Sequence, residues 1–292
     1  MRYLIINADG YGFTEGISRA IEECIEFGTV LSLSANVNFK HADGLARLVR
    51  KHPEISVGCH INPVVGCPVL PANKVLTLLD DNGEFFYQTF SKRLLTGHIR
   101  LSELRAEMIA QVEKARDMAA RAFSHIDFHM GLHRFPAIYS LFLDVAEKCD
   151  VRRMRTHRYL VGMESRSPYI THYLHLVKSP ARSLKFVWNL WLRKKALDRH
   201  FVMPDRRAEF TRMGTRPDIL TVKHYLMLLR NIPQGFNEFV VHPGYVDDDL
   251  RRWSTYLDER VLEREVLLSS QFREALYSSD ICLAGYRDIP LN

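Results

Sequence analysis

Short apolar segments alternate with amphipathic helical segments along most of the chain, and this alternation restricts the fold more than any other feature. Tyr3–Asn7 has the character of a buried strand, and the segment 15–28 has apolar side chains at helical spacing with Gly28 at its end. Further strand-like segments lie at 30–37, 55–62, 124–130, 151–157, 236–242 and 281–286. Repeated strand–helix units of this kind predict an α/β fold with a parallel sheet.

The number of strand-like segments suggests how the sheet is arranged. Seven or eight strands within 292 residues favour a TIM-like (β/α) barrel variant. An open doubly wound sheet is the alternative, although the glycines after Asp9 do not have the GxGxxG spacing of a dinucleotide-binding turn. We expect residues 1–292 to form a single domain, with inserted loops and helices at about 66–98 and 156–220.

Composition restricts the class of partner and the compartment. The formal net charge of +6 suits anionic partners but is small for a nucleic-acid binder, so no nucleic acid is expected. The five cysteines form no CxxC pair, which argues against a disulfide scaffold or a structural zinc site. The sequence shows neither a signal-peptide pattern nor an uncharged run long enough to span a membrane. These features predict a cytoplasmic protein.

Titratable and polar residues recur where the predicted strands end. In a barrel of parallel strands the active site lies at the carboxyl ends of the strands, so these side chains would meet there. A single histidine at a strand end is usually an ordinary hydrogen-bonding group, but a set on separate strands favours chemistry. The set comprises Asp9, His60, Asp127, His129, Arg155 and His242, with His133 four residues after His129.

The residue types in this set suit metal-assisted hydrolysis. His60 and His129 offer imidazoles, which commonly bind zinc-like ions, and a carboxylate often completes such a site. A bound divalent ion lowers the pKa of a water ligand and so provides a nucleophile. Asp9 could then accept a proton, and His242 could protonate a leaving amine. The alternative for His242 alone is an ordinary strand-ending turn before Pro243.

His125 and Asp127 alternate with His129 on one predicted strand. Side chains at positions i and i+2 of a strand share a face, so all three would lie on the same side of the sheet. Groups beside a metal ligand commonly orient it by hydrogen bonding. We therefore expect His125 and Asp127 to position the metal ligands.

Several motifs together resemble the YdjC-like family of carbohydrate deacetylases, which includes chitooligosaccharide and hopanoid-pathway deacetylases. The resemblance runs nearly end to end and is carried by "IINADGYGFTEG", "VGCHINPVVGCPV", "HIDFHMGLH", "VVHPGY" and "ERVLEREVLLS". The family is described as TIM-like barrels that use a divalent metal to hydrolyse the acetamide of N-acetylated sugars. The resemblance thus implies a barrel, a zinc or magnesium cofactor and an N-acetylated amino sugar as substrate.

The resemblance also implies roles for individual residues. His60 and His129 would be metal ligands, with Asp9 as general base and His242 as general acid. By position, Arg155 and His133 would face the substrate.

One position departs from the family pattern. The family usually reads Asn-Ala-Asp-Asp-Phe-Gly at the end of its first strand, and the second aspartate is its third metal ligand. This chain has Gly10 there. Three explanations stay open. The metal site is completed by Asp9, by another carboxylate or by water; or the metal binds weakly; or the activity is lost.

The leading hypothesis is hydrolysis of an N-acyl group on an amino sugar, either within an oligosaccharide or carried on a polyprenyl phosphate. A glycan-binding protein with an impaired metal site is an alternative from a different class, motivated by Gly10. A metal phosphoesterase is a third hypothesis, because histidine-rich barrels also support that chemistry.

The segment 178–200 combines basic and aromatic residues. Leu184, Val187, Trp188 and Trp191 share one face of a predicted helix, and basic side chains lie on another face. A helix of this kind suits a membrane surface, or it could close over a lipid-linked sugar. It would make the protein peripheral on the inner membrane surface. The alternative is a helix that packs on the barrel and exposes its basic side chains to solvent. Whether the protein forms a homodimer is a separate question that the sequence leaves open.

Overall fold

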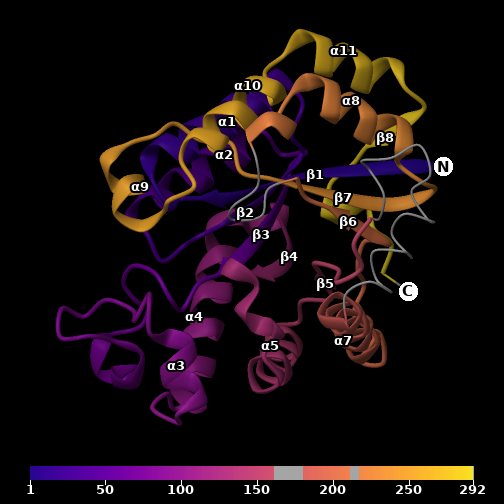
Figure 1. The fold of residues 1–292 in the computed structure, drawn as a ribbon. Helices are drawn as coiled ribbons and strands as arrows, with labels where there is room; N and C mark the ends of the chain where they lie inside the picture. The colour runs from indigo at the N-terminus through magenta and orange to yellow at the C-terminus, as the bar shows by residue number, and fades with distance from the viewer. Residues whose placement is uncertain (161–179, 211–216, 292) are drawn as a thin grey trace.

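The computed structural model describes residues 1–160, 180–210 and 217–291. Its central feature is a parallel sheet whose strands follow the order β5-β4-β3-β2-β1-β7-β6, with β8 paired to the beginning of β1 (Figure 1). The strands are β1 (Arg2–Tyr11), β2 (Ser32–Ala35), β3 (Ser56–Ile61), β4 (Phe123–Phe128), β5 (Arg153–Met154), β6 (Arg206–Ala208), β7 (Gly235–Val241) and β8 (Ile281–Leu283).

The two ends of this sheet approach each other. Isolated parallel bridges join Arg153 to Val202 and Tyr159 to Arg207, so the segment that contains β5 pairs with the segment that contains β6. The sheet is therefore curled rather than open, and the fold is a TIM-like barrel variant as the strand count predicted. The open doubly wound alternative does not describe it.

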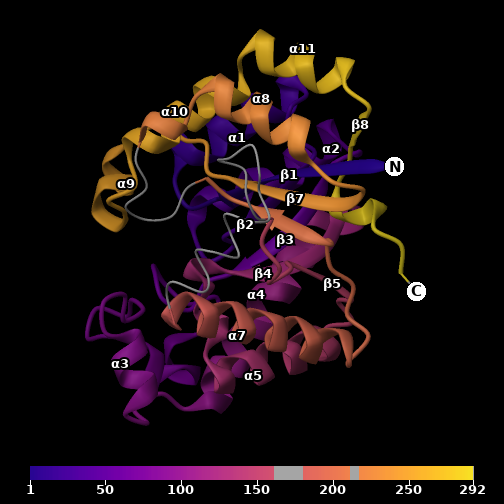
Figure 2. The same ribbon diagram turned by 45° about the vertical axis from the view of Figure 1, so that its right-hand side comes forward.

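Helices cover the outside of the curled sheet. In both views α1, α8, α10 and α11 lie on one side, while α4, α5 and α7 lie on the other (Figures 1 and 2). The helices are α1 (Glu15–Phe27), α2 (Leu45–Lys51), α3 (Phe90–Leu95), α4 (Leu101–Ala119), α5 (Pro136–Lys148), α7 (Pro180–Leu197), α8 (Val222–Asn231), α9 (Asp248–Trp253), α10 (Asp258–Leu267) and α11 (Ser270–Ser278). Short 3-10 turns, η1 to η7, connect several of these elements.

Local sequence signals explain some helix ends and fail at others. The Thr14 side chain caps α1 by accepting from the Ile17 amide, and Gly28 ends the helix with φ 87°, as predicted. Ser102 is a residue type that often caps helices, but α4 already begins at Leu101 and has no side-chain cap. Ser102 therefore lies inside the first turn instead.

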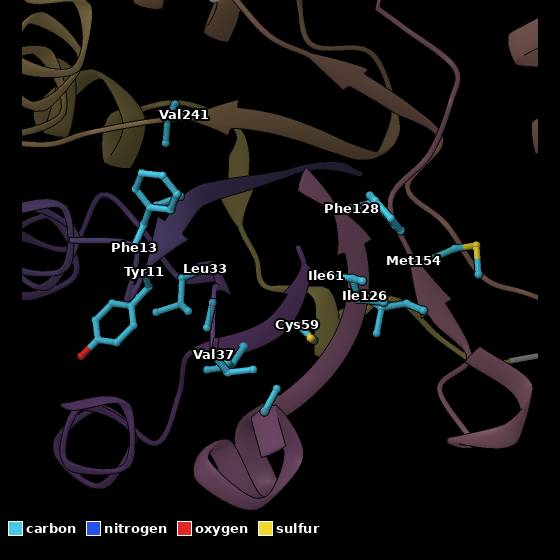
Figure 3. Packing of buried hydrophobic residues seen from close by; sticks show 14 of the residues in the cluster. Tyr11, Phe13, Leu33, Val37, Cys59, Ile61, Ile126, Phe128, Met154 and Val241 are labelled. Atoms are coloured by element: carbon cyan, nitrogen blue, oxygen red, sulfur yellow. The ribbon is translucent and has the colours of Figure 1, made fainter. Parts of the chain in front are cut away.

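The two faces of the sheet differ sharply in polarity. Alternate residues of each strand pack against the helices, and Figure 3 shows Leu33, Cys59, Ile61 and Ile126 in this apolar layer. The intervening positions carry polar or small side chains to the inside of the barrel. These include Asn7, Asp9, Ser32, Ser34, Gly58, His60, His125, Asp127 and Glu238, and all of these residues are buried. The polar interior is where a functional site can form.

The predicted insertions have different outcomes in the structure. The span 66–98 contains short turns and α3, whereas 156–220 contributes α7 and also β6, a strand of the barrel itself. Residues 161–179 and 211–216 lie outside the described part of the chain. Among the helices that are described, none combines the length and apolar character needed to cross a bilayer.

Candidate functional site

Three buried carboxylates converge on the guanidinium of Arg155 inside the barrel. The two terminal nitrogens of Arg155 donate to both carboxylate oxygens of Asp9, each at 2.6 Å. One of these nitrogens also lies 2.7 Å from Asp127, and the Nε–H donates to Glu238 at 2.8 Å. Strands β1, β4 and β7 are thus tied to the residue that follows β5.

This ion network sets the charge state of its members. Burial opposes ionisation of Asp9, but Arg155 and then His60 hold the pKa of Asp9 well below its ordinary value. The pKa of Asp127 is lowered in the same way, whereas burial raises the pKa of Glu238 despite its contact with Arg155. Asp9 is therefore ionised near neutral pH, but a carboxylate held by a guanidinium is a weak base.

Asp127 contacts His60 in the manner of an orienting carboxylate. The Nδ1 atom of His60 lies 2.8 Å from Asp127 Oδ1, and both side chains are buried. Burial would lower the pKa of His60, but the Asp127 and Asp9 carboxylates more than offset it and raise that pKa. A proton on Nδ1 would leave Nε2 as the metal-binding nitrogen, which is a common arrangement around ligating histidines.

His125 supports this arrangement from deeper in the barrel. Its ring stacks on Tyr286 with centroids 3.6 Å apart, and its Nε2 lies 3.3 Å from the Ser34 hydroxyl, which donates to Asp127 at 3.0 Å. Gly58 makes room for the ring, because a Cβ there would lie 2.3 Å from His125 Nε2. His125 is therefore linked to Asp127 through Ser34.

His129 and His242 stand at the mouth of the same interior. The His129 ring meets the His60 ring edge-on with centroids 5.3 Å apart. Burial lowers the pKa of His129 to about 3 and that of His242 to about 4, so both imidazoles are neutral near pH 7. Neutral imidazole is the form that binds metal, which suits the role predicted for His129. His242 would have to gain a proton before it could act as a general acid.

A cavity of about 360 Å³ connects these residues. Its lining includes Asp9, His60, His129 and His242, together with Arg155. Aromatic side chains also line it. They include Phe13, Tyr87, Tyr159, Trp253 and Tyr256.

The donor set fits a divalent metal in its chemistry. Ligand atoms of Asp9, His60 and Asp127 lie within 4.8 Å of one another, and the His129 ring adjoins His60. The same carboxylates already contact Arg155, so a metal would share Asp9 or Asp127 with the guanidinium. A carboxylate that is shared with Arg155 should bind a metal more weakly than a third carboxylate that contacts the metal alone.

Gly10 lacks that carboxylate and also has a backbone unsuited to one. Its φ is +105°, a conformation that L residues rarely adopt. A Cβ would nevertheless have space, since its nearest neighbour is Ile17 Cγ2 at 3.6 Å. The departure from the family pattern therefore involves the local backbone as well as the missing side chain.

The two residues expected to face substrate have different surroundings. Arg155 lines the cavity, but all of its hydrogen bonds described above go to carboxylates. His133 also lines the cavity and packs against Phe142 and His157, and its buried Nδ1 has no hydrogen-bond partner among the described residues. Direct substrate contact stays a prediction for both residues.

The sequence reasoning missed two groups of the network. Glu238 carries the third carboxylate, and Asn7 donates to Asp9 at 2.8 Å and to Ser34 at 2.9 Å. An acidic residue inside the apolar strand "FNEFVV" was a signal that could have identified Glu238, because an unpaired charge is rarely buried.

Comparison with known proteins identifies the family. The family model described as YdjC-like protein matches residues 3–278. This chain belongs to the YdjC-like family. Carbohydrate deacetylases of Thermoanaerobacter pseudethanolicus and Geobacillus stearothermophilus are 24% and 27% identical to it, and each alignment covers 98% of both chains.

A solved structure shares the fold of this YdjC-like protein. It is a putative cellobiose-phosphate cleavage protein from Enterococcus faecalis V583, with a TM-score of 0.71 and 25% identity. The match covers 98% of this chain and 97% of that one. The family resemblance seen in the sequence motifs is thus confirmed.

Replacing Arg155 by alanine should strongly destabilise the fold. It would leave the Asp9, Asp127 and Glu238 carboxylates buried together without their cation. Breaking a buried ion pair on one side typically costs about 3–5 kcal/mol of unfolding free energy. Urea denaturation at pH 7 with a chelator present would measure the loss.

Arg199→Ala is the matched control for that substitution. Arg199 also contacts two carboxylates, Asp144 at 2.8 Å and Glu147, but these groups are partly exposed. Its loss should cost about 1 kcal/mol or less. Equal losses for the two variants would contradict a special role for the buried network.

Proposed function

We propose that this protein is a carbohydrate deacetylase that hydrolyses the N-acetyl group of an amino sugar. The observation that carries the proposal is that Asp9, His60, His129 and His242 line one cavity at the strand ends of a YdjC-like barrel. Relatives aligned over nearly the whole chain bear the name carbohydrate deacetylase.

The proposed chemistry divides among the cavity residues. His60 and His129 would hold a divalent metal, zinc or magnesium, and one oxygen of Asp9, which lies 4.0 Å from His60 Nδ1, would complete the protein ligands. When bound, such an ion polarises the amide carbonyl and lowers the pKa of water. The other oxygen of Asp9 would accept the water proton, and His242, which is neutral near pH 7, would take up a proton and deliver it to the departing amine. Because Arg155 holds both oxygens of Asp9, we expect slow turnover.

The aromatic side chains of the cavity suit a sugar ring. Tyr87, Trp253 and Tyr256 provide flat apolar surfaces in the cavity that also holds the polar groups. Ligand pockets commonly combine apolar walls with a few placed polar groups. The substrate would therefore lie with its acetamide toward His60 and with its ring against these aromatic side chains.

Glycan binding without turnover is the second candidate. Two observations favour it: Gly10 provides no carboxylate, and Arg155 donates hydrogen bonds to both oxygens of Asp9. Each of these reduces the number of oxygen ligands that are left for a metal. It predicts saturable binding of N-acetylated sugars with no released acetate and no bound metal by elemental analysis.

Acetate release from N-acetylated sugars tests the enzyme proposal. The purified chain with added zinc or magnesium should release acetate, and His129→Ala should reduce both activity and bound metal by at least about 10–100-fold, which is the typical cost of losing even a group that only orients a metal ligand. His98→Ala is the control, because His98 is exposed and remote from the cavity lining. Absence of acetate from free, oligomeric and polyprenyl-linked sugars would refute the proposal.

We also propose that α7 contacts an anionic membrane surface, which would bring a lipid-linked sugar to the cavity. Helix α7 exposes apolar side chains beside the exposed lysines Lys185 and Lys194, and Lys185 also lines the cavity. Trp188 is half-buried and donates to the Arg134 carbonyl at 3.2 Å, so it anchors the helix instead. The exposed apolar residues of α7 include Leu184, Val187, Leu190 and Trp191.

Sedimentation with vesicles tests this contact. The triple variant Leu184→Ser, Val187→Ser, Trp191→Ser should bind anionic phospholipid vesicles much less than the parent. A control with Leu76→Ser and Leu95→Ser, which are exposed elsewhere, should bind normally. Failure of the parent to bind would refute the contact. A dimer in gel filtration that the triple variant loses would instead assign this face to a second copy of the chain.

A further inference from the structure

Helix α10 packs against the turn that carries His242. The backbone N–H of His242 donates to the Glu263 carboxylate, and the carbonyl of His242 accepts from the Arg260 guanidinium at 3.4 Å. The amide of Gly244 donates to the Arg260 carbonyl at 3.2 Å, and Pro243 between them has no N–H to satisfy. Two residues of one helix therefore hold this turn by its backbone groups.

The spacing of these two residues explains how a single helix holds the turn. Arg260 and Glu263 are three positions apart, so their side chains lie on the same face of α10. Both are buried, and Glu263 is 0% exposed. A carboxylate is rarely buried completely unless other groups replace the water that it loses. Apolar packing alone would not favour Glu263 at this position, which points to a task for its carboxylate.

The same carboxylate lies close to the imidazole ring of His242. Glu263 Oε2 is 3.9 Å from His242 Nδ1, a distance too long for a hydrogen bond but short for an electrostatic interaction between buried groups. The Tyr256 ring stands edge-on to the imidazole, with centroids 5.8 Å apart and 71° between the planes. The imidazole thus packs on an aromatic ring and has a carboxylate beside one of its two nitrogens.

This placement bears on which nitrogen of His242 carries the proton. Burial lowers the pKa of His242 to about 4, so the ring is neutral near pH 7 and has a single N–H. A carboxylate near Nδ1 favours the tautomer with the proton on Nδ1. Nε2 then has a free lone pair, which can take up a proton and pass it to the amine nitrogen as the C–N bond breaks. The opposite tautomer has no lone pair on Nε2 for that purpose.

We propose that Glu263 is a positioning residue that fixes the orientation and the tautomer of His242, while Arg260 helps to hold the turn. The proposal rests on the proposed function for the role of His242, but the tautomer is a property of the chain without metal or substrate. Carboxylates that orient a histidine through its Nδ1–H recur in enzymes. Asp127 has the same relation to His60 on the other side of the reaction, at 2.8 Å.

Imidazole NMR of the metal-free chain tests the tautomer directly. Long-range proton–nitrogen spectra of the isotope-labelled chain at pH 7 distinguish a protonated ring nitrogen from a bare one. The signals that disappear in His242→Gln belong to His242. We expect the Nδ1–H tautomer in the parent. The Nε2–H tautomer in the parent would overturn the proposal, and this measurement does not depend on the folding of any Glu263 variant.

Glu263→Gln removes the charge and keeps the size of the side chain. It should increase the population of the Nε2–H tautomer of His242 and reduce kcat for an N-acetylated sugar by about 10–100-fold, with bound metal unchanged. Glu107→Gln is the matched control. Glu107 is also fully buried and accepts from the backbone amides of Val69 and Leu70, but it does not line the cavity. An identical tautomer in Glu263→Gln and the parent would contradict the proposal.

The leaving group separates the positioning of a general acid from a general loss of structure. A departing amine needs a proton, whereas nitrophenolate leaves as an anion without one. Glu263→Gln should therefore slow acetate release from N-acetylglucosamine but hardly change the hydrolysis of para-nitrophenyl acetate that depends on His129. Equal losses on the two substrates would overturn the positioning role. If the parent hydrolyses neither substrate, the enzyme proposal fails, and the NMR result still decides whether Glu263 fixes the tautomer of His242.

Discussion

The structure depends on one guanidinium shared by three buried carboxylates. Arg155 follows β5, and its partners Asp9, Asp127 and Glu238 come from three different strands of the curled sheet, β1, β4 and β7. The apolar faces of the strands pack against helices, so the opposite faces must be filled by groups that satisfy each other's charge and hydrogen bonds. The barrel interior is consequently a polar network that opens into the cavity.

This network explains both the chemistry that the site can support and its weakness. It keeps Asp9 ionised and, through Asp127, orients His60, but it also reduces the basicity of Asp9 and occupies the carboxylates that a metal would use. Gly10, with its φ of +105°, supplies no replacement ligand. On the basis of this arrangement we propose a slow deacetylase with a weakly held metal.

The sequence predicted the barrel and the position of the main side chains, because strand–helix alternation and strand ends are local signals. It did not predict what those side chains contact. The family resemblance implied that Arg155 faces substrate, and that role stays a prediction, but nothing in the spacing reveals that three carboxylates surround this side chain. The short strand β6 lies in a segment that the sequence predicted to be an insertion, and the reason is similar. Its pairing with β7, which puts Arg207 opposite Glu238, joins distant parts of the chain and leaves no local pattern in the sequence.

A crystal structure soaked with zinc, with anomalous scattering at the zinc edge, tests the central claim most directly. The account predicts one ion bound by His60 and His129, with an oxygen of Asp9 completing the protein ligands and Arg155 still in contact with Asp127 and Glu238. No zinc at these histidines, with the Arg155 network intact at millimolar zinc, would contradict the metal-dependent mechanism. An ion seated between Asp9 and Asp127 with Arg155 displaced would contradict the role assigned to the guanidinium.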